Sequence, residues 1–173
     1  MESTNPNLVF DCDRLITIFN NLFSKEYATR LIKGGKEPFY KAAKHQEVDH
    51  QLIFREDFFS SALHEVAHWC LAGEGRLLQD DFGYWYESEQ RDLEAQRRFF
   101  AVEIKPQALE AIFSKACGYP FEVSVDNHNV SRWLNNEVEL FAAKVAAQIE
   151  TFQHEGLPTR AQKFEQALKA HFL

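Results

Sequence analysis

Residues 58–73 read FFSSALHEVAHWCLAG, and the centre of this stretch is the pentad His64-Glu65-Val66-Ala67-His68. Its composition predicts a helix over residues 58–72, with Asp57 as N-cap and Gly73 just beyond the end. Two histidines four residues apart lie on one helical face, about 40° apart around the axis, so one divalent metal ion can bind both imidazoles. The pentad therefore predicts a metal site, although it names neither the metal nor the reaction.

The two sides of this helix differ in composition. One side is apolar and carries Phe59, Leu63, Val66 and Cys70. The other carries the two histidines, small residues, and Glu65 as the only formally charged residue. Because a solvent-exposed face would hold Lys, Arg and several Glu, we expect protein to cover the histidine side as well. Two interpretations remain open: a metal cleft, or two histidines bonded to backbone or water.

A third metal ligand would have to come from another part of the chain, as a carboxylate or a histidine. The extended metzincin pattern fails, because Leu71 and Glu74 stand where that pattern has glycine and histidine. Glu103 is the strongest candidate, because it lies in the apolar run 99–104 and faces the apolar side of its own predicted helix. A buried carboxylate needs a partner, either a metal ion or a buried Arg or Lys. Glu74 and Asp81 are the next candidates.

Composition limits the class of protein. The chain has 173 residues, a net charge of −7, and 16 Phe, 3 Trp and 5 Tyr, which suits one domain with an aromatic core. The acidic balance argues against nucleic-acid binding. Three cysteines without a CxxC pair, no signal peptide and no membrane-length apolar run indicate a cytoplasmic protein.

The pattern along the chain predicts a single α+β domain over residues 1–173, with a flexible leader at 1–8. It contains a small mixed sheet, several packed helices and a metal site on a central HExxH helix. The expected helices cover residues 9–24, 58–72, 89–104, 106–116, 135–153 and 159–172. Short strands are expected at residues 30–32, 38–40, 52–54 and 121–125, and residues 77–86 form a strand or an ordered aromatic loop. The break between the third and fourth helices is placed at Lys105-Pro106, with Pro106 opening the later helix.

Several segments, in order along the whole chain, resemble the bacterial elongation factor P hydroxylases. The matching segments are Thr29-Arg30-Leu31-Ile32-Lys33-Gly34, Ser61-Ala62-Leu63-His64-Glu65-Val66-Ala67-His68-Trp69-Cys70, Asp81-Phe82-Gly83-Tyr84-Trp85-Tyr86, Val102-Glu103-Ile104-Lys105-Pro106-Gln107-Ala108-Leu109 and Ala116-Cys117-Gly118-Tyr119-Pro120-Phe121. This set of segments is far more specific than the pentad alone.

The resemblance implies a metal- and oxygen-dependent hydroxylase of the elongation factor P lysine, acting after a β-lysyl group has been attached. It implies a 2-His-1-carboxylate site of His64, His68 and Glu103 that holds Fe(II) and uses O2. It also implies a fold like that of a small metal-dependent ribonuclease, not a double-stranded β-helix oxygenase. The source of the reducing electrons is not visible in the sequence.

Other residues receive roles as hypotheses. Glu65 would manage protons or orient a ligand near the metal. Asp81, Tyr84, Trp85 and Tyr86 would bind the substrate side chain, since aromatic faces attract ammonium groups; core packing is the alternative for each ring. Basic residues in the segment 25–44 would either dock the acidic protein substrate or form an ordinary solvated face.

Alternative functions remain open from the pentad. An HExxH zinc peptidase would use Glu65 as general base. A metal-dependent hydrolase or RNase would follow from the fold analogy alone. A binding module with a structural metal, or with none, would show no specific chemical loss when the histidines are replaced.

Overall fold

The computed structural model describes residues 10–45, 48–81, 91–127 and 132–173. Its elements in chain order are α1 (Cys12–Tyr27), β1 (Thr29–Lys33), β2 (Phe39–Lys41), β3 (His50–Phe54), α2 (Phe59–Leu71), η2 (Arg76–Leu78), α3 (Leu93–Cys117), α4 (Arg132–Glu155) and α5 (Thr159–Phe172). This is the α+β arrangement that the sequence predicts, with the three early strands at the expected places.

The strands form one mixed sheet in the order β1-β3-β2. Strand β3 pairs with β1 in parallel and with β2 antiparallel, so that Leu52 lies opposite both Leu31 and Tyr40. Gly34 follows β1 and donates its N–H to Phe54 O at 2.9 Å. A Cβ at Gly34 would lie 2.8 Å from that same oxygen, so only glycine allows this close approach. Among the described residues the strands form no double-stranded β-helix.

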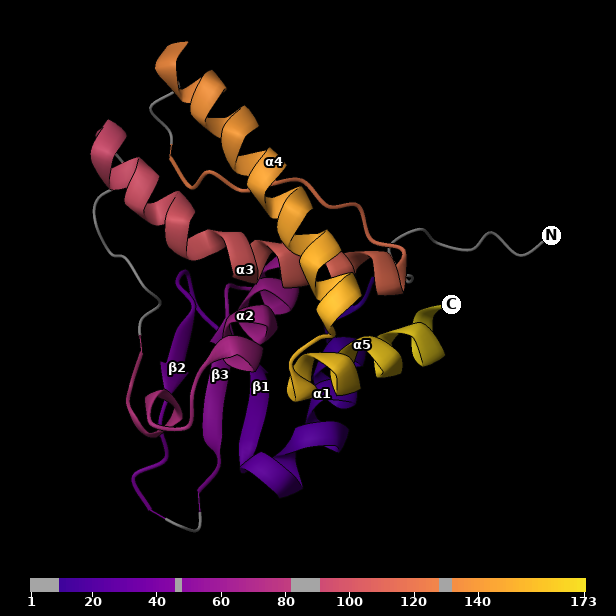
Figure 1. Ribbon diagram of the computed structural model, residues 1–173. Coiled ribbons are helices and arrows are strands. Elements are labelled where there is room, and N and C mark those ends of the chain that lie inside the picture. Colours follow the sequence, from indigo (N-terminus) through magenta and orange to yellow (C-terminus); the bar gives the residue numbers. More distant parts are fainter. Residues whose placement is uncertain (1–9, 46–47, 82–90, 128–131) are drawn as a thin grey trace, which may run out of the picture.

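The helices stack outward from the sheet (Figure 1). Helix α2 contacts β3 on one side and α3 on the other, and α4 packs on α3 farther from the sheet. Helix α1 packs on β1, and α5 contacts α1, α2 and α3. Helix α2, with the HExxH pentad, therefore contacts the sheet and three other helices. Among the described residues, no helix combines the length and the apolar composition that a membrane span requires.

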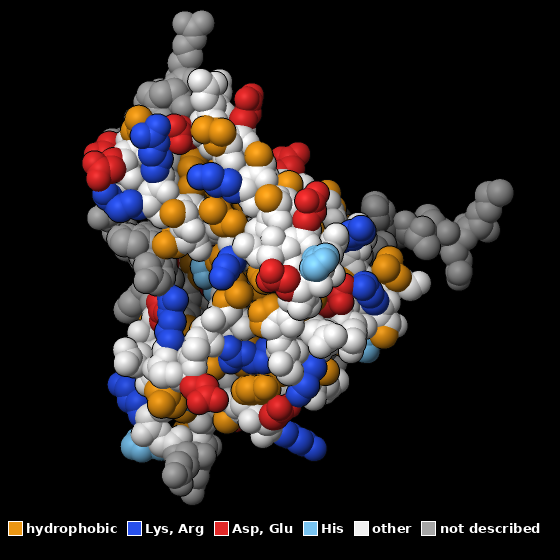
Figure 2. Space-filling view, viewed as in Figure 1, with side chains coloured by type: hydrophobic (Ala, Val, Ile, Leu, Met, Phe, Trp, Pro, Cys, Tyr) orange, Lys and Arg blue, Asp and Glu red, His pale blue; other side chains and the backbone are white. Residues whose placement is uncertain are grey.

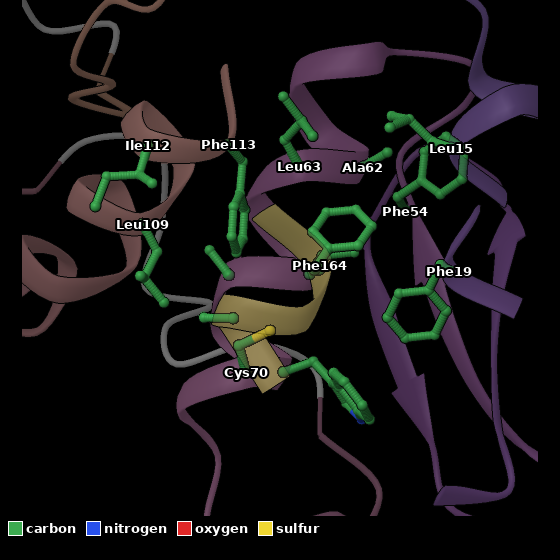
Figure 3. Packing of buried hydrophobic residues seen from close by; sticks show 14 of the residues in the cluster. Leu15, Phe19, Phe54, Ala62, Leu63, Cys70, Leu109, Ile112, Phe113 and Phe164 are labelled. Atoms are coloured by element: carbon green, nitrogen blue, oxygen red, sulfur yellow. The ribbon is translucent and has the colours of Figure 1, made fainter. Parts of the chain in front are cut away.

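One hydrophobic cluster joins the five described α-helices and the sheet. In Figure 3, Phe164 of α5 lies between side chains of α1 and β3 on one side and side chains of α3 on the other. Its ring lies 5.0 Å from that of Phe113 and 6.2 Å from that of Phe19, measured between centroids. The apolar side of α2 points into this cluster, as its spacing predicts, and Leu63 and Val66 are fully buried.

The ends of the first two helices follow local chemistry. Helix α1 begins at Cys12 and has Asp11 as its N-cap, whose side chain accepts from Asp13 N. It runs three residues beyond the predicted end. The prediction of Asp57 as N-cap of α2 is wrong, because the N-cap is Phe58. The Asp57 carboxylate instead lies 2.9 Å from Lys33 Nζ, in an ion pair that draws it away from the helix.

The predicted break at Pro106 is also wrong. Helix α3 runs without interruption through this proline, which is buried. A proline inside a helix removes one hydrogen bond and bends the axis, and α3 changes direction along its length in Figure 1. Packing of α3 against α2, α4 and α5 compensates for this loss. The helix ends at Gly118, which is left-handed with φ 70°.

Residues 121–125 form no strand, so that prediction is wrong. Their alternation is as expected, with Phe121, Val123 and Val125 half-buried and the residues between them exposed. The backbone groups of Ser124 and Val125, however, form hydrogen bonds with side chains of α3. Gln107 bonds both backbone groups of Ser124, and Gln96 Nε2 donates to Val125 O at 2.9 Å.

The last two helices follow the predicted pattern. Helix α4 exceeds its predicted range at both ends, and α5 has the predicted range. In the predicted segment 77–86, the described part contains the end of η2 and a bridge between Asp81 and Tyr40. Tyr84, Trp85 and Tyr86 lie outside the described residues, as do residues 1–9.

Charges of both signs share the surface. On the face shown in Figure 2, Lys and Arg side chains lie among Asp and Glu, with hydrophobic side chains between them. Within the basic segment 25–44, Arg30 pairs with Asp49 at 2.5 Å, and Lys33 pairs with both Asp13 and Asp57. Some of this positive charge is therefore already compensated within the protein.

Candidate metal centre

The two histidines of the pentad lie one helical turn apart on α2. Their Nε2 atoms are 3.1 Å apart, and their side chains are 23% and 25% exposed for His64 and His68. The histidine side of α2 is therefore partly covered, as its lack of charged residues predicts. The neighbouring Ser60, Ser61 and Ala72 are also half-buried.

Helix α3 brings Glu103 to the two histidines. This residue is 4% exposed, with Oε1 3.0 Å from His68 Nε2 and Oε2 3.5 Å from His64 Nε2. In the described part of the chain its partners are these imidazoles and Gln107, with no Arg or Lys among them. Among the described residues, Glu103 therefore does not form the buried ion pair with Arg or Lys that was the alternative to a metal site.

The three side chains suit a metal ion in both chemistry and spacing. One ligand atom of each residue can be chosen so that all lie within 4.8 Å of one another. Metal–ligand bonds of about 2.1 Å at right angles would put neighbouring ligand atoms about 3.0 Å apart. The spacings of 3.0, 3.1 and 3.5 Å are close to that value. Two imidazoles and one carboxylate form a set that binds Fe(II) or Zn2+.

Two further side chains of α3 hold these three in place. Gln107 Nε2 donates to Glu103 Oε2 at 3.2 Å, and Gln107 is itself fixed by Ser124. Glu110 Oε2 lies 2.7 Å from His64 Nδ1. Neither residue is predicted from the sequence, although positions 103, 107 and 110 have the spacing of one helical face. The predicted break at Pro106 put Glu103 in a different helix from Gln107 and Glu110, so their shared face was not expected.

The electrostatics of the site favour a cation. Burial disfavours the protonated form of His64, but the carboxylates of Glu103 and Glu110 outweigh it and raise the His64 pKa to about 10. Burial also disfavours the ionised form of Glu103. The interactions of its carboxylate with His64 and His68 outweigh this effect of burial and lower the Glu103 pKa to about 2. A divalent ion that binds here would therefore displace a proton from His64 and meet an ionised Glu103.

A pocket of about 430 Å³, partly open to solvent, lies beside His68. Its lining residues come from the sheet, α2 and the segment after α2: Tyr40, Leu52, Glu65, His68, Trp69, Ala72, Arg76, Leu77 and Asp81. Glu65 thus faces the same space as His68, and burial raises the Glu65 pKa. Asp81 also lines the pocket, where its carboxylate lies 2.5 Å from Arg76 Nε.

The remaining acidic candidates lie elsewhere. Glu74 is exposed and is not part of the three-residue cluster. Asp80 accepts a hydrogen bond from Ala42 N at 2.9 Å, which gives it a structural partner. The described residues therefore bring His64, His68 and Glu103 together, with Glu65 and Asp81 along the adjoining pocket.

Comparison with known proteins agrees with the resemblance seen in the sequence. The chain matches the family described as elongation factor P hydroxylase over residues 18–173. A curated relative from Haemophilus influenzae, named elongation factor P lysine hydroxylase, is 44% identical over 158 residues, which are 91% of this chain and 87% of the relative. This chain therefore belongs to the elongation factor P hydroxylase family.

Proposed function

We propose that this protein hydroxylates the β-lysylated lysine of elongation factor P, with a metal ion held by His64, His68 and Glu103. The observation that carries the proposal is the convergence of these three side chains in a chain of this family. The curated relative is named for lysine hydroxylation of the same factor.

The metal we propose is Fe(II). When bound, it would supply the one-electron chemistry with O2 that the redox-inert Zn2+ cannot supply. His64 and His68 would hold it from α2, and Glu103 would hold it from α3 and offset its charge. Hydroxylation as a monooxygenase converts one C–H bond and O2 into C–OH and water, and consumes two electrons and two protons. An external reductant supplies the electrons in this proposal.

The pocket beside His68 is the proposed place of the substrate side chain. It opens next to a metal ligand, and aliphatic and aromatic side chains cover part of its wall. Glu65 lines the same pocket and burial raises its pKa, so in this proposal it would take up or release a proton there. Asp81 would meet a substrate ammonium group at the pocket wall. Tyr84, Trp85 and Tyr86 remain predicted substrate-binding residues.

The experiment is intact-mass analysis of β-lysylated elongation factor P after incubation with this protein, Fe(II), oxygen and ascorbate. We expect a gain of one oxygen atom that a chelator abolishes and that His64→Ala abolishes. If the mass stays unchanged with Fe(II) and with each of several reductants, the proposed activity is wrong.

An HExxH zinc peptidase is the second candidate, because two histidines and a glutamate also form a catalytic zinc site. Glu65 would then act as general base toward a water molecule. That function predicts zinc in the purified protein and peptide cleavage that Glu65→Gln abolishes. Metal analysis of the purified protein and a peptide-cleavage assay with Glu65→Gln therefore separate this function from hydroxylation.

A further inference from the structure

Glu110 makes the shortest contact in the metal centre, and the ligand set leaves its role unexplained. Its Oε2 atom lies 2.7 Å from His64 Nδ1, while Nε2 of the same ring faces His68 and Glu103. Glu110 therefore contacts the ring from the side away from the ligand cluster. It is not a member of that cluster.

The surroundings of Glu110 do not suit a purely structural carboxylate. The residue is 8% exposed, and such burial is costly unless the charge is paired. Within the described residues its polar partner is His64, and no Arg or Lys is paired with it there. Its burial is therefore compensated by the imidazole of a proposed metal ligand.

We propose that Glu110 is a positioning residue that holds the His64 ring with Nδ1–H toward the carboxylate and Nε2 toward the metal. A neutral imidazole has one N–H and one lone pair, so a carboxylate that accepts from Nδ1–H leaves the Nε2 lone pair available. Such a partner also fixes the ring plane and makes the coordinating nitrogen more basic. This inference rests on the metal site of the proposed function.

The position of Glu110 on α3 strengthens this role. Glu103 and Glu110 are seven residues apart, about two helical turns, and so lie on the same face of one helix. One rigid element therefore supplies both a ligand and the group that orients a second ligand on α2. A buried hydrogen bond of this kind keeps the ring within the narrow range of orientations that metal binding needs.

The test uses Zn2+ as a diamagnetic probe and four variants of the full chain. Glu110→Ala removes the acceptor, and Glu110→Gln keeps an acceptor oxygen of the same size without the charge. Glu94→Gln is the matched control, because Glu94 lies on α3 with its side chain 84% exposed and pairs with Arg98, away from the metal centre. His64→Ala reports on the metal site itself. Circular dichroism confirms that each variant is folded.

Two readouts separate positioning from general stability. We expect Glu110→Ala to weaken Zn2+ binding by about 10–100-fold in competition with a chromophoric chelator. Glu110→Gln should fall between Glu110→Ala and the unmodified protein, and Glu94→Gln should match the unmodified protein. In NMR spectra of the zinc-loaded, 15N-histidine-labelled protein, the His64 Nδ1–H proton should be protected from exchange, and Glu110→Ala should remove that protection.

The proposal is overturned if Glu110→Ala and Glu110→Gln both bind Zn2+ as the unmodified protein does and keep a protected Nδ1–H. If Glu110→Ala does not fold, Glu110→Gln decides, because unchanged affinity in that variant contradicts the role of the charge. Unchanged Zn2+ affinity in His64→Ala would instead contradict the proposed metal site. The two failures are therefore distinguishable.

Discussion

Replacing Gln107 by leucine should weaken both the fold and the metal centre, because this one side chain connects them. Gln107 is fully buried, donates to Glu103 Oε2 and Ser124 O, and accepts from Ser124 N. Leucine has a similar volume and makes none of these three bonds. The change therefore tests hydrogen bonding with little change in packing.

The expected loss in the free energy of unfolding follows from the three hydrogen bonds that Gln107→Leu removes. A hydrogen bond between neutral groups contributes about 0.5–1.5 kcal/mol, and one to a charged group about 1.5–3 kcal/mol. The two bonds to Ser124 and the one to Glu103 give roughly 2.5–6 kcal/mol. Ser124 is exposed, so water can replace part of its bonding. We expect a loss of about 3 kcal/mol in the free energy of unfolding.

The assay is urea unfolding with excess chelator, followed by a separate measurement of Zn2+ affinity. Without its donor, Glu103 is less firmly oriented, so we expect affinity to fall about tenfold or more. Gln96→Leu is the matched control, because Gln96 is equally buried on α3 and bonds Val125 O and Asn127, away from the metal ligands. It should lose stability but keep its Zn2+ affinity. Equal Zn2+ affinities for the two variants would contradict the assigned role of Gln107 in orienting Glu103.

Three further predictions follow from the site and the core. Because the His64 pKa is raised to about 10, Zn2+ binding at pH 8 should release about one proton from this residue, and affinity should rise with pH until about pH 10. Calorimetry in buffers of different ionisation enthalpy measures the number of protons released. Zn2+ binding without proton release would contradict the protonated state assigned to His64. Phe164→Ala should lower the free energy of unfolding by about 3–5 kcal/mol, since this ring is fully buried between α1 and α3. The half-buried Phe172 of the same helix serves as control; an equal loss for Phe172→Ala would contradict the assigned core. Arg160→Ala should lower the free energy of unfolding by about 1–3 kcal/mol. The reason is that Arg160 donates to Cys70 O and Ala72 O at the end of α2 and lies over the Trp69 ring. An unchanged urea unfolding curve would contradict this prediction.

The sequence contains enough information to predict which three side chains come together at the candidate centre. The pentad, its sparsely charged helical face and the burial of Glu103 in an apolar run together indicate the three side chains that the structure brings within ligand distance. The three early strands are equally clear, since short apolar pieces between glycines and polar residues suit only short elements.

The remaining features depend on tertiary contacts that local patterns do not contain. Pro106 has the local signature of a helix start, yet packing on both sides keeps α3 continuous. That continuity places Gln107 and Glu110 on the face of Glu103. The alternating residues 121–125 have the pattern of a strand, but their hydrogen-bond partners are glutamine side chains. Asp57 has the character of a cap, but Lys33, distant in sequence, binds it instead.

In the proposed function, this protein adds an oxygen atom from O2 to its substrate at the centre of His64, His68 and Glu103. The most direct measurement is the intact mass of β-lysylated elongation factor P after reaction under 18O2, with Fe(II) and ascorbate. We expect one added oxygen that carries the heavy isotope, its loss in Glu103→Ala, and its retention in the control Glu94→Ala. An unlabelled added oxygen, or full activity in Glu103→Ala, would contradict the account.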